Sequence, residues 1–186
     1  MGELVLSALG VAACADAIAA STADEVTARR EAEVLVRSAR DVARLGLTRG
    51  TEVGPEGRAW LRRAEAELTR VRRTPDPDAW TAVVEAFSYG DGYRQAHARF
   101  RRAEAALLPA ATADPAGAAR LRRDAADDLR LAAGAAADLG ARPLADAVAA
   151  LTARSGLRVD TPAENAGAPA ASVRPAAAPG GNGAGG

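Results

Sequence analysis

Cys14 and His97 are the one cysteine and the one histidine among the 186 residues, so any thiol or imidazole chemistry depends on these two side chains. A structural zinc site takes four Cys or His ligands, and a catalytic zinc usually has three protein ligands. One residue of each kind completes neither set, and a single cysteine has no partner for a disulfide within the chain. We therefore expect no metal, no cofactor and no thiol-based catalysis.

Closely spaced carboxylates are the other groups that could perform acid–base catalysis. The pairs are Glu65 with Glu67 and Asp127 with Asp128. Residues one or two positions apart on a helix do not converge on one point, so we interpret both pairs as solvent-facing charges. Because no spacing brings a nucleophile, a base and an oxyanion donor together, we expect no catalytic residue.

His97 has an ordinary pKa near 6.5 and could therefore sense pH or bind a ligand. It follows Ala96 directly and lies off the apolar stripe of its helix, so a partly exposed histidine without a specific role is the simpler interpretation. A small-molecule-binding enzyme that uses Tyr93, His97 and arginines in a cavity is the least favoured hypothesis.

The basic residues are all arginine, and the formal net charge is zero because 24 of them face 24 Asp and Glu. Without lysine the chain has no P-loop lysine and no Schiff-base chemistry. Arg-Arg doublets recur, but acidic residues are interspersed with them, so we interpret the doublets as solvated helix faces and expect no direct nucleic-acid binding. The doublets begin at Arg29, Arg62, Arg72, Arg101 and Arg122.

The composition predicts an all-α fold. Hydrophobic residues make up 48% of the chain but aromatic residues only 3%, and alanine, the best helix former, supplies much of the apolar character. Strand-forming β-branched and aromatic residues are scarce, which excludes a sandwich or barrel. We expect seven helices near 3–20, 23–45, 55–72, 77–88, 92–108, 115–139 and 143–155.

Helix ends are predicted from capping residues. Thr22 and Glu25 have the spacing of a capping box. Proline is expected just inside four helix starts, and Gly46 and Gly140 suit the left-handed residue that closes a helix. Short connections favour antiparallel hairpins stacked as a short α-solenoid. The four starts are at Gly54-Pro55, Asp76-Pro77, Asp114-Pro115 and Arg142-Pro143.

One motif is typical of packing between repeated helices. Gly90, Tyr93, Ala96, Phe100 and Ala103 resemble the turn and second helix of a tetratricopeptide repeat, in which small residues let the paired helix approach and rings fill the gaps. We predict a repeat-packing role for all five. Trp60 and Trp80 lie on apolar stripes and are likewise expected in the core.

A broader resemblance covers about half of the chain, from 59 to 159. The segments PDPDAW at 75–80, ARFRxAEA at 98–105 and LGARPL at 139–144 follow one another as in large ATP-binding LuxR-type transcriptional regulators. In that family a tetratricopeptide-like region lies between an ATPase module and a helix-turn-helix. The resemblance implies a non-enzymatic, cytoplasmic region that couples signals or binds a protein partner or its own flanking domains.

The chain also departs from that family. Gly92 stands where proline usually accompanies the tyrosine of the turn. An ATPase motif and a recognition helix are both lacking, so neither ATP hydrolysis nor DNA binding carries over, and we interpret the chain as a fragment. We expect one helical domain over 1–160 and a disordered Ala/Pro/Gly-rich linker or tail over 161–186.

The first twenty residues allow an alternative function, a secreted or lipid-anchored helical protein modified at Cys14. The apolar run before Cys14 superficially resembles a signal segment. Glu3 is acidic, no Lys or Arg precedes the run, and Asp16 interrupts it, whereas secretion signals begin with positive charge. The run is also too short and interrupted for a membrane span, so we favour a buried first helix and Cys14 as a small core residue.

Overall fold

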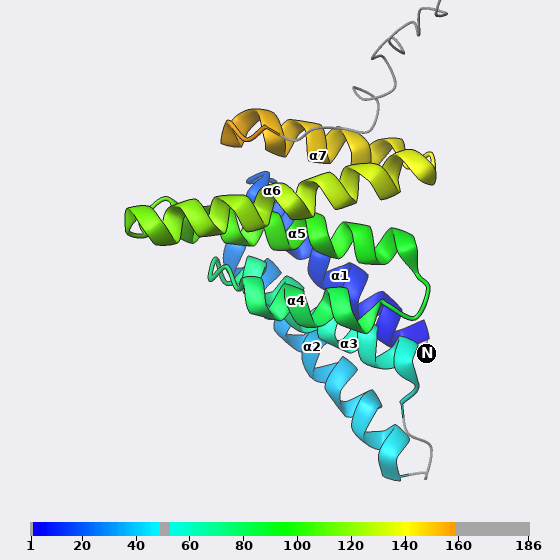
Figure 1. The fold of residues 1–186 in the computed structure, drawn as a ribbon. Helices are drawn as coiled ribbons and strands as arrows, with labels where there is room; N and C mark the ends of the chain where they lie inside the picture. Colours follow the sequence, from blue (N-terminus) through cyan, green and yellow to red (C-terminus); the bar gives the residue numbers. More distant parts are fainter. Residues whose placement is uncertain (1, 49–52, 159–186) are drawn as a thin grey trace, which may run out of the picture.

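The computed structural model describes residues 2–48 and 53–158, and every regular element in this part of the chain is a helix (Figure 1). The predicted all-α class and number of helices are confirmed. The expected tail over 161–186 lies outside the described residues. The helices are α1 (Gly2–Ala19), α2 (Glu25–Thr48), α3 (Pro55–Val71), α4 (Pro77–Ala86), α5 (Gly92–Ala110), α6 (Pro115–Asp138) and α7 (Arg142–Ser155).

Most predicted helix ends are confirmed. Proline occupies the first turn of α3, α4, α6 and α7, where a missing N–H has no cost. The Asp76 and Asp114 carboxylates cap α4 and α6 by accepting backbone N–H bonds, and Gly140 closes α6 with φ +62°. The conformation of Gly140 is one that side-chain-bearing residues adopt at a cost.

Two predicted ends of α2 are wrong. Asp24, and not Thr22, caps this helix, because the Asp24 Oδ2 accepts from the Thr27 N–H at 2.8 Å. The Thr22 hydroxyl instead donates to the Ala17 carbonyl at the end of α1. The helix also continues through Gly46 to Thr48.

The helices form two packed groups that share α5. In the first, α1 packs on both α2 and α3, and α4 lies between α3 and α5. In the second, α5, α6 and α7 stack one above another, as the upper part of Figure 1 shows. Second-neighbour packing, which a regular solenoid repeats at every step, is present for α1 with α3 and for α5 with α7. The predicted solenoid-like stacking is therefore not established by this arrangement.

Helix α5 has a face for each group because small residues alternate around it. Ala98 and Ala105 belong to the N-terminal core, formed by α1–α4, whereas Ala96, Phe100 and Ala103 belong to the C-terminal core, formed with α6 and α7. Close packing of alanine faces holds the two groups on one helix.

The residues predicted to pack between helices are mostly buried, and Tyr93 is the most exposed aromatic ring among them. Trp60 and Trp80 are 2% and 0% exposed and lie in the N-terminal core. Gly90 forms the turn before α5 with φ +123°, a conformation that favours glycine. Tyr93 is 42% exposed, and its predicted gap-filling role stays a prediction. Tyr93 is in the first turn of α5, which lies at the molecular surface, and the buried Ala96 follows one turn later.

Candidate interaction groove

A groove of about 1060 Å³ lies at the C-terminal ends of α1, α3, α5 and α7. In Figure 1 the ends of α5 and α7 that contribute to it are on the left. It lies where α1 and α3 of the first group and α7 of the second border α5. Its volume is at the upper end of the range of ligand pockets, which is about 300–1,000 Å³. The lining residues used below are Ile18, Arg70, Arg73, Arg101, Glu104, Leu107, Leu108, Arg122, Leu151 and Arg154.

Glu104 is the one carboxylate in the groove lining, where it accompanies five arginines. It accepts from Arg101 Nη1 at 2.8 Å and from Arg154 Nη2 at 3.3 Å. Arg70 Nε lies 3.9 Å from the same carboxylate. Guanidinium groups of α3, α5 and α7 therefore surround the Glu104 carboxylate of α5. This arrangement shows that the groove accommodates a negatively charged group.

Asp16 extends this ion-pair network to α1. Its Oδ1 accepts from Arg70 Nη2 at 2.6 Å and from Arg101 Nη2 at 3.2 Å. Burial by itself would raise the pKa of Asp16, but hydrogen bonds and charge from Arg70 and Arg101 lower it overall. The four helices whose C-terminal ends border the groove are thus joined by charge-assisted hydrogen bonds.

Glu67 lies beneath the network and corrects the prediction that the acidic pairs face solvent. Its side chain is 0% exposed and accepts from Arg70 Nη1 at 2.6 Å, whereas Arg63 Nε is 3.7 Å away. Arg63, from one of the doublets interpreted as solvated, is also buried. Glu65, which the sequence pairs with Glu67, is partly exposed and forms an ion pair with Arg40. The inner member of the pair is therefore structural.

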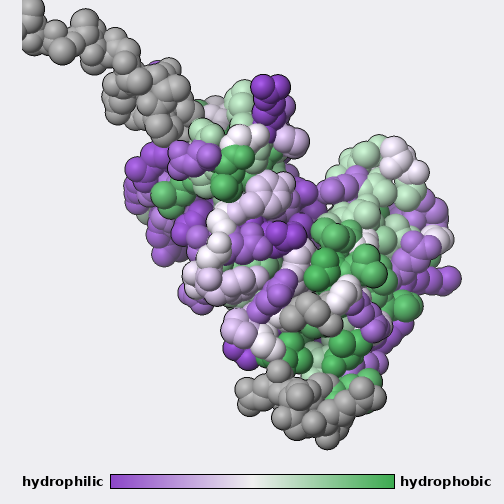
Figure 2. Space-filling model, turned by 90° about the vertical axis from the view of Figure 1, so that its right-hand side faces the viewer, coloured by the Kyte–Doolittle hydropathy of each residue, from purple (hydrophilic) through white to green (hydrophobic). Residues whose placement is uncertain are grey.

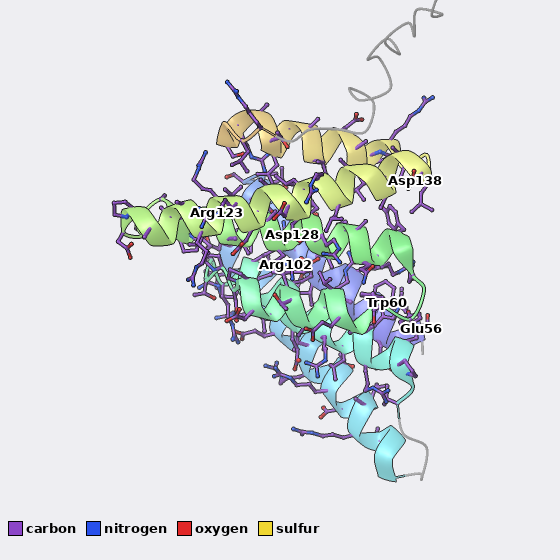
Figure 3. The ribbon with its side chains drawn as sticks, in the orientation of Figure 1. Glu56, Trp60, Arg102, Arg123, Asp128 and Asp138 are labelled. Atoms are coloured by element: carbon purple, nitrogen blue, oxygen red, sulfur yellow. The ribbon has the colours of Figure 1, made fainter. Side chains whose placement is uncertain are left out.

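Asp128 is the second buried acid that was expected to face solvent. Arg102 holds it with two hydrogen bonds, Nε to Oδ2 at 2.6 Å and Nη2 to Oδ1 at 2.5 Å, and Arg99 adds a third at 3.4 Å. Figure 3 shows Arg102 on α5 and Asp128 on α6 pointing toward one another. Asp127, its neighbour, is exposed as predicted and pairs with Arg130. The Arg102–Asp128 ion pair therefore holds α6 against α5, outside the groove.

His97 is partly buried on α5, with its ring 6.2 Å from that of Phe100. Burial, together with the charges of Arg63, Arg101 and Arg70, lowers its pKa to about 3. The imidazole is therefore neutral at physiological pH, which disfavours a pH-sensing role near neutrality. Within the part of the chain that the structure describes, no three His, Cys, Asp or Glu residues gather closely enough to hold a metal ion.

Cys14 lies on α1, partly buried against the N-terminal core, and burial raises the pKa of its thiol. By length and composition α1 could cross a membrane, contrary to the expectation from Asp16, but one side of it packs on α2 and α3. Leu6 and Leu9 of α1 are exposed. Figure 2, viewed from the side where α1 begins, shows hydrophobic surface on that face of the molecule.

The sequence did not indicate the groove. Arg70, Arg101 and Glu104 resemble ordinary surface charges in a helical pattern, since nothing local distinguishes an arginine that pairs across helices from one in water. The one available signal is that Arg101 and Glu104 share the segment 98–105 with the alanines of α5. Comparison with protein-family models, curated proteins and solved structures found no match to this chain.

Proposed function

We propose that the chain is a non-enzymatic helical interaction region, which binds a protein partner or the flanking domains of a larger regulator. The observation that carries the proposal is the groove at the ends of four helices, with apolar walls and arginine side chains. Protein interfaces combine these features: an apolar centre, and arginines whose guanidinium groups can form two parallel hydrogen bonds to a carboxylate. Within the described residues, the ionisable side chains at the groove are held in ion pairs or hydrogen bonds and are not arranged as a nucleophile and base.

Coupling of signals is the second part of the proposal. Helix α5 belongs to both cores, and the ion pairs of Asp16, Arg101 and Glu104 connect α1 to α7 through it. A partner that moves α7 would therefore act on α1 and α3 through small shifts of packed helices. This behaviour suits a region between an ATPase module and a DNA-binding module, as in the LuxR-type regulators that the sequence resembles.

The regulator hypothesis is tested by reading the coding sequence on both sides of the chain. An ATPase module before Met1 and a helix-turn-helix after Gly186 would support it. The interaction hypothesis is tested by cross-linking in the native cell, identification of the cross-linked protein, and calorimetry with the two purified proteins. Saturable one-to-one binding is expected. Failure of every identified protein to bind the purified chain would contradict the interaction role.

The alternative, a secreted or lipid-anchored protein, is favoured only by the apolar character of α1. Cleavage before Cys14 would remove Leu4, Ala8 and Val11, all buried in the N-terminal core. Losing these side chains would leave a large cavity between α2 and α3. Mass spectrometry of the native protein decides between the two: a mature N-terminus at lipid-modified Cys14 would support the alternative.

A further inference from the structure

We infer that the groove binds an acidic amphipathic segment of a partner protein, in which Asp or Glu alternates with aliphatic residues; this inference rests on the proposed interaction role. Two sets of observations support it, the arginines whose donors remain available at the rim and the apolar side chains between them.

The inner arginines are largely satisfied within the chain. Arg70 binds Asp16 and Glu67, and Arg101 binds Asp16 and Glu104. Their side chains are 16% and 13% exposed. They therefore shape the floor of the groove and hold α1, α3 and α5 together, and they are not the main contacts for an incoming carboxylate.

The rim arginines are available. Arg154 on α7 is 56% exposed and reaches Glu104 by one bond at 3.3 Å. Arg122 on α6 donates through Nη2 to the Ser155 carbonyl at 2.9 Å, and it forms no ion pair with a carboxylate of residues 2–48 or 53–158. A guanidinium carries five N–H donors, so both side chains keep donors for a carboxylate placed between α6 and α7.

The apolar side chains of the groove are the reason why the segment must also contain aliphatic residues. Ile18 of α1, Leu107 and Leu108 of α5 and Leu151 of α7 border the groove. Leu108 is 60% exposed, so its side chain is accessible to a segment lying in the groove. Aliphatic residues of the segment would pack here, while its carboxylates pair with Arg122 and Arg154. A nucleic-acid backbone would use the arginines but leave this apolar lining unoccupied, which favours an acidic peptide.

The test begins with random peptides displayed on phage and selected on the full chain. We expect enrichment of Asp and Glu interleaved with Leu, Ile or Val. A selected peptide is then synthesised with a fluorescent label, together with its Asn/Gln counterpart, and binding is measured by anisotropy. The acidic form should bind at least about tenfold more tightly, the effect of one lost charge-assisted hydrogen bond, and its affinity should fall with added salt.

Variants locate the binding site. Arg122→Gln/Arg154→Gln should weaken binding of the acidic peptide by about tenfold or more, and so should Leu108→Asn. The matched control Arg44→Gln/Arg130→Gln removes the same charge from exposed positions that do not line the groove, and its affinity should stay within about twofold of wild type. Thermal unfolding checks that each variant is folded. We expect all of them to fold, because the side chains of Arg44, Leu108, Arg130 and Arg154 are more than half exposed. The Arg122 substitution removes one hydrogen bond, to the Ser155 carbonyl.

Several results would overturn the inference. They are selection without acidic enrichment, equal binding of the neutral peptide, an equal loss in the control variant, or Arg122- and Arg154-dependent binding of a single-stranded oligonucleotide in place of the peptide. A native partner that binds the Arg122→Gln/Arg154→Gln variant as well as wild type would also overturn it, while the proposed interaction role would stand.

Discussion

Arg102 of α5 and Asp128 of α6 form a two-bond ion pair in which the aspartate side chain is only 6% exposed. The guanidinium fork matches the carboxylate and also donates to the Thr81 hydroxyl of α4 at 3.2 Å. This relationship joins three consecutive helices where the two cores meet.

Asp128→Asn should destabilise the protein by about 2–4 kcal/mol, because it leaves a partly buried guanidinium without its counter-charge. The neighbouring Asp127→Asn is the matched control. Asp127 is 67% exposed and pairs with Arg130, so its replacement should cost less than about 0.5 kcal/mol. Urea unfolding followed by circular dichroism measures both, and equal midpoints for the two variants would show that the buried pair is unimportant.

The C-terminal core offers a second matched comparison on α6. Leu129 is 0% exposed, whereas Leu131, two residues along, is 49% exposed. Leu129→Ala should cost about 2–5 kcal/mol through lost burial and a residual cavity, and Leu131→Ala much less. Both free energies of unfolding come from the same urea titrations. A small loss at Leu129 would mean that α6 does not pack on α5 and α7 as described.

Gly134 within α6 and Gly140 just after its C-terminus should respond to alanine in opposite directions. Gly134 is inside the helix, and a Cβ there would meet no atom within 4 Å, so Gly134→Ala should stabilise by about 0.5–1 kcal/mol. Gly140 closes the same helix with φ +62°. Gly140→Ala should therefore destabilise by about 1 kcal/mol. Thermal melts measure the signs, and a shift in the same direction for both would refute the assigned C-terminus of α6.

The lowered pKa of His97 leads us to expect that the stability of the protein depends on pH. In the unfolded chain its pKa is near 6.5, and in the folded protein it is about 3. Between these values the unfolded state binds more protons, so stability falls as the pH falls from about 6.5 towards 3. Wild type should lose about 1–2 kcal/mol between pH 7 and pH 5 through this group, given about 1.4 kcal/mol per pKa unit.

The His97→Gln variant should remove that slope, as urea midpoints across the pH range would show. Asp16 does not interfere, because its pKa is lowered from 3.8 and its contribution is lost only at more acid pH. An unchanged slope in the variant, or an NMR titration of the His97 ring near pH 6.5, would contradict the described environment.

Local chemistry explains why most of the fold was predictable. The prolines at 55, 77, 115 and 143 mark helix starts by a rule that involves one or two residues. Trp60 and Phe100 were assigned to the core because their stripes recur every three or four residues. The error at α2 has a similar origin: Thr22 and Asp24 are both good caps, and the choice between them depends on how the preceding turn leaves α1.

The charged interior could not be predicted, because it depends on contacts between distant residues. Glu67 and Asp128 look like the outer members of helix faces until Arg70 and Arg102 are placed against them in three dimensions. Tyr93 shows the reverse, since a stripe that is buried at Ala96 and Phe100 emerges at the surface one turn earlier. The groove likewise depends on residues far apart in the sequence, from Ile18 to Arg154, which line it together.

The most direct test of the interaction role is an NMR titration of the isotope-labelled full chain with the selected acidic peptide, which reports the arginine Nε–H and leucine methyl signals together. We expect the signals of Arg122, Arg154, Leu108 and Leu151 to shift in proportion to bound peptide. The signals of the exposed Arg130 and Leu131, which do not line the groove, should stay unchanged. Shifts confined to the hydrophobic surface of α1, or a titration that leaves the groove signals unmoved, would contradict this expectation.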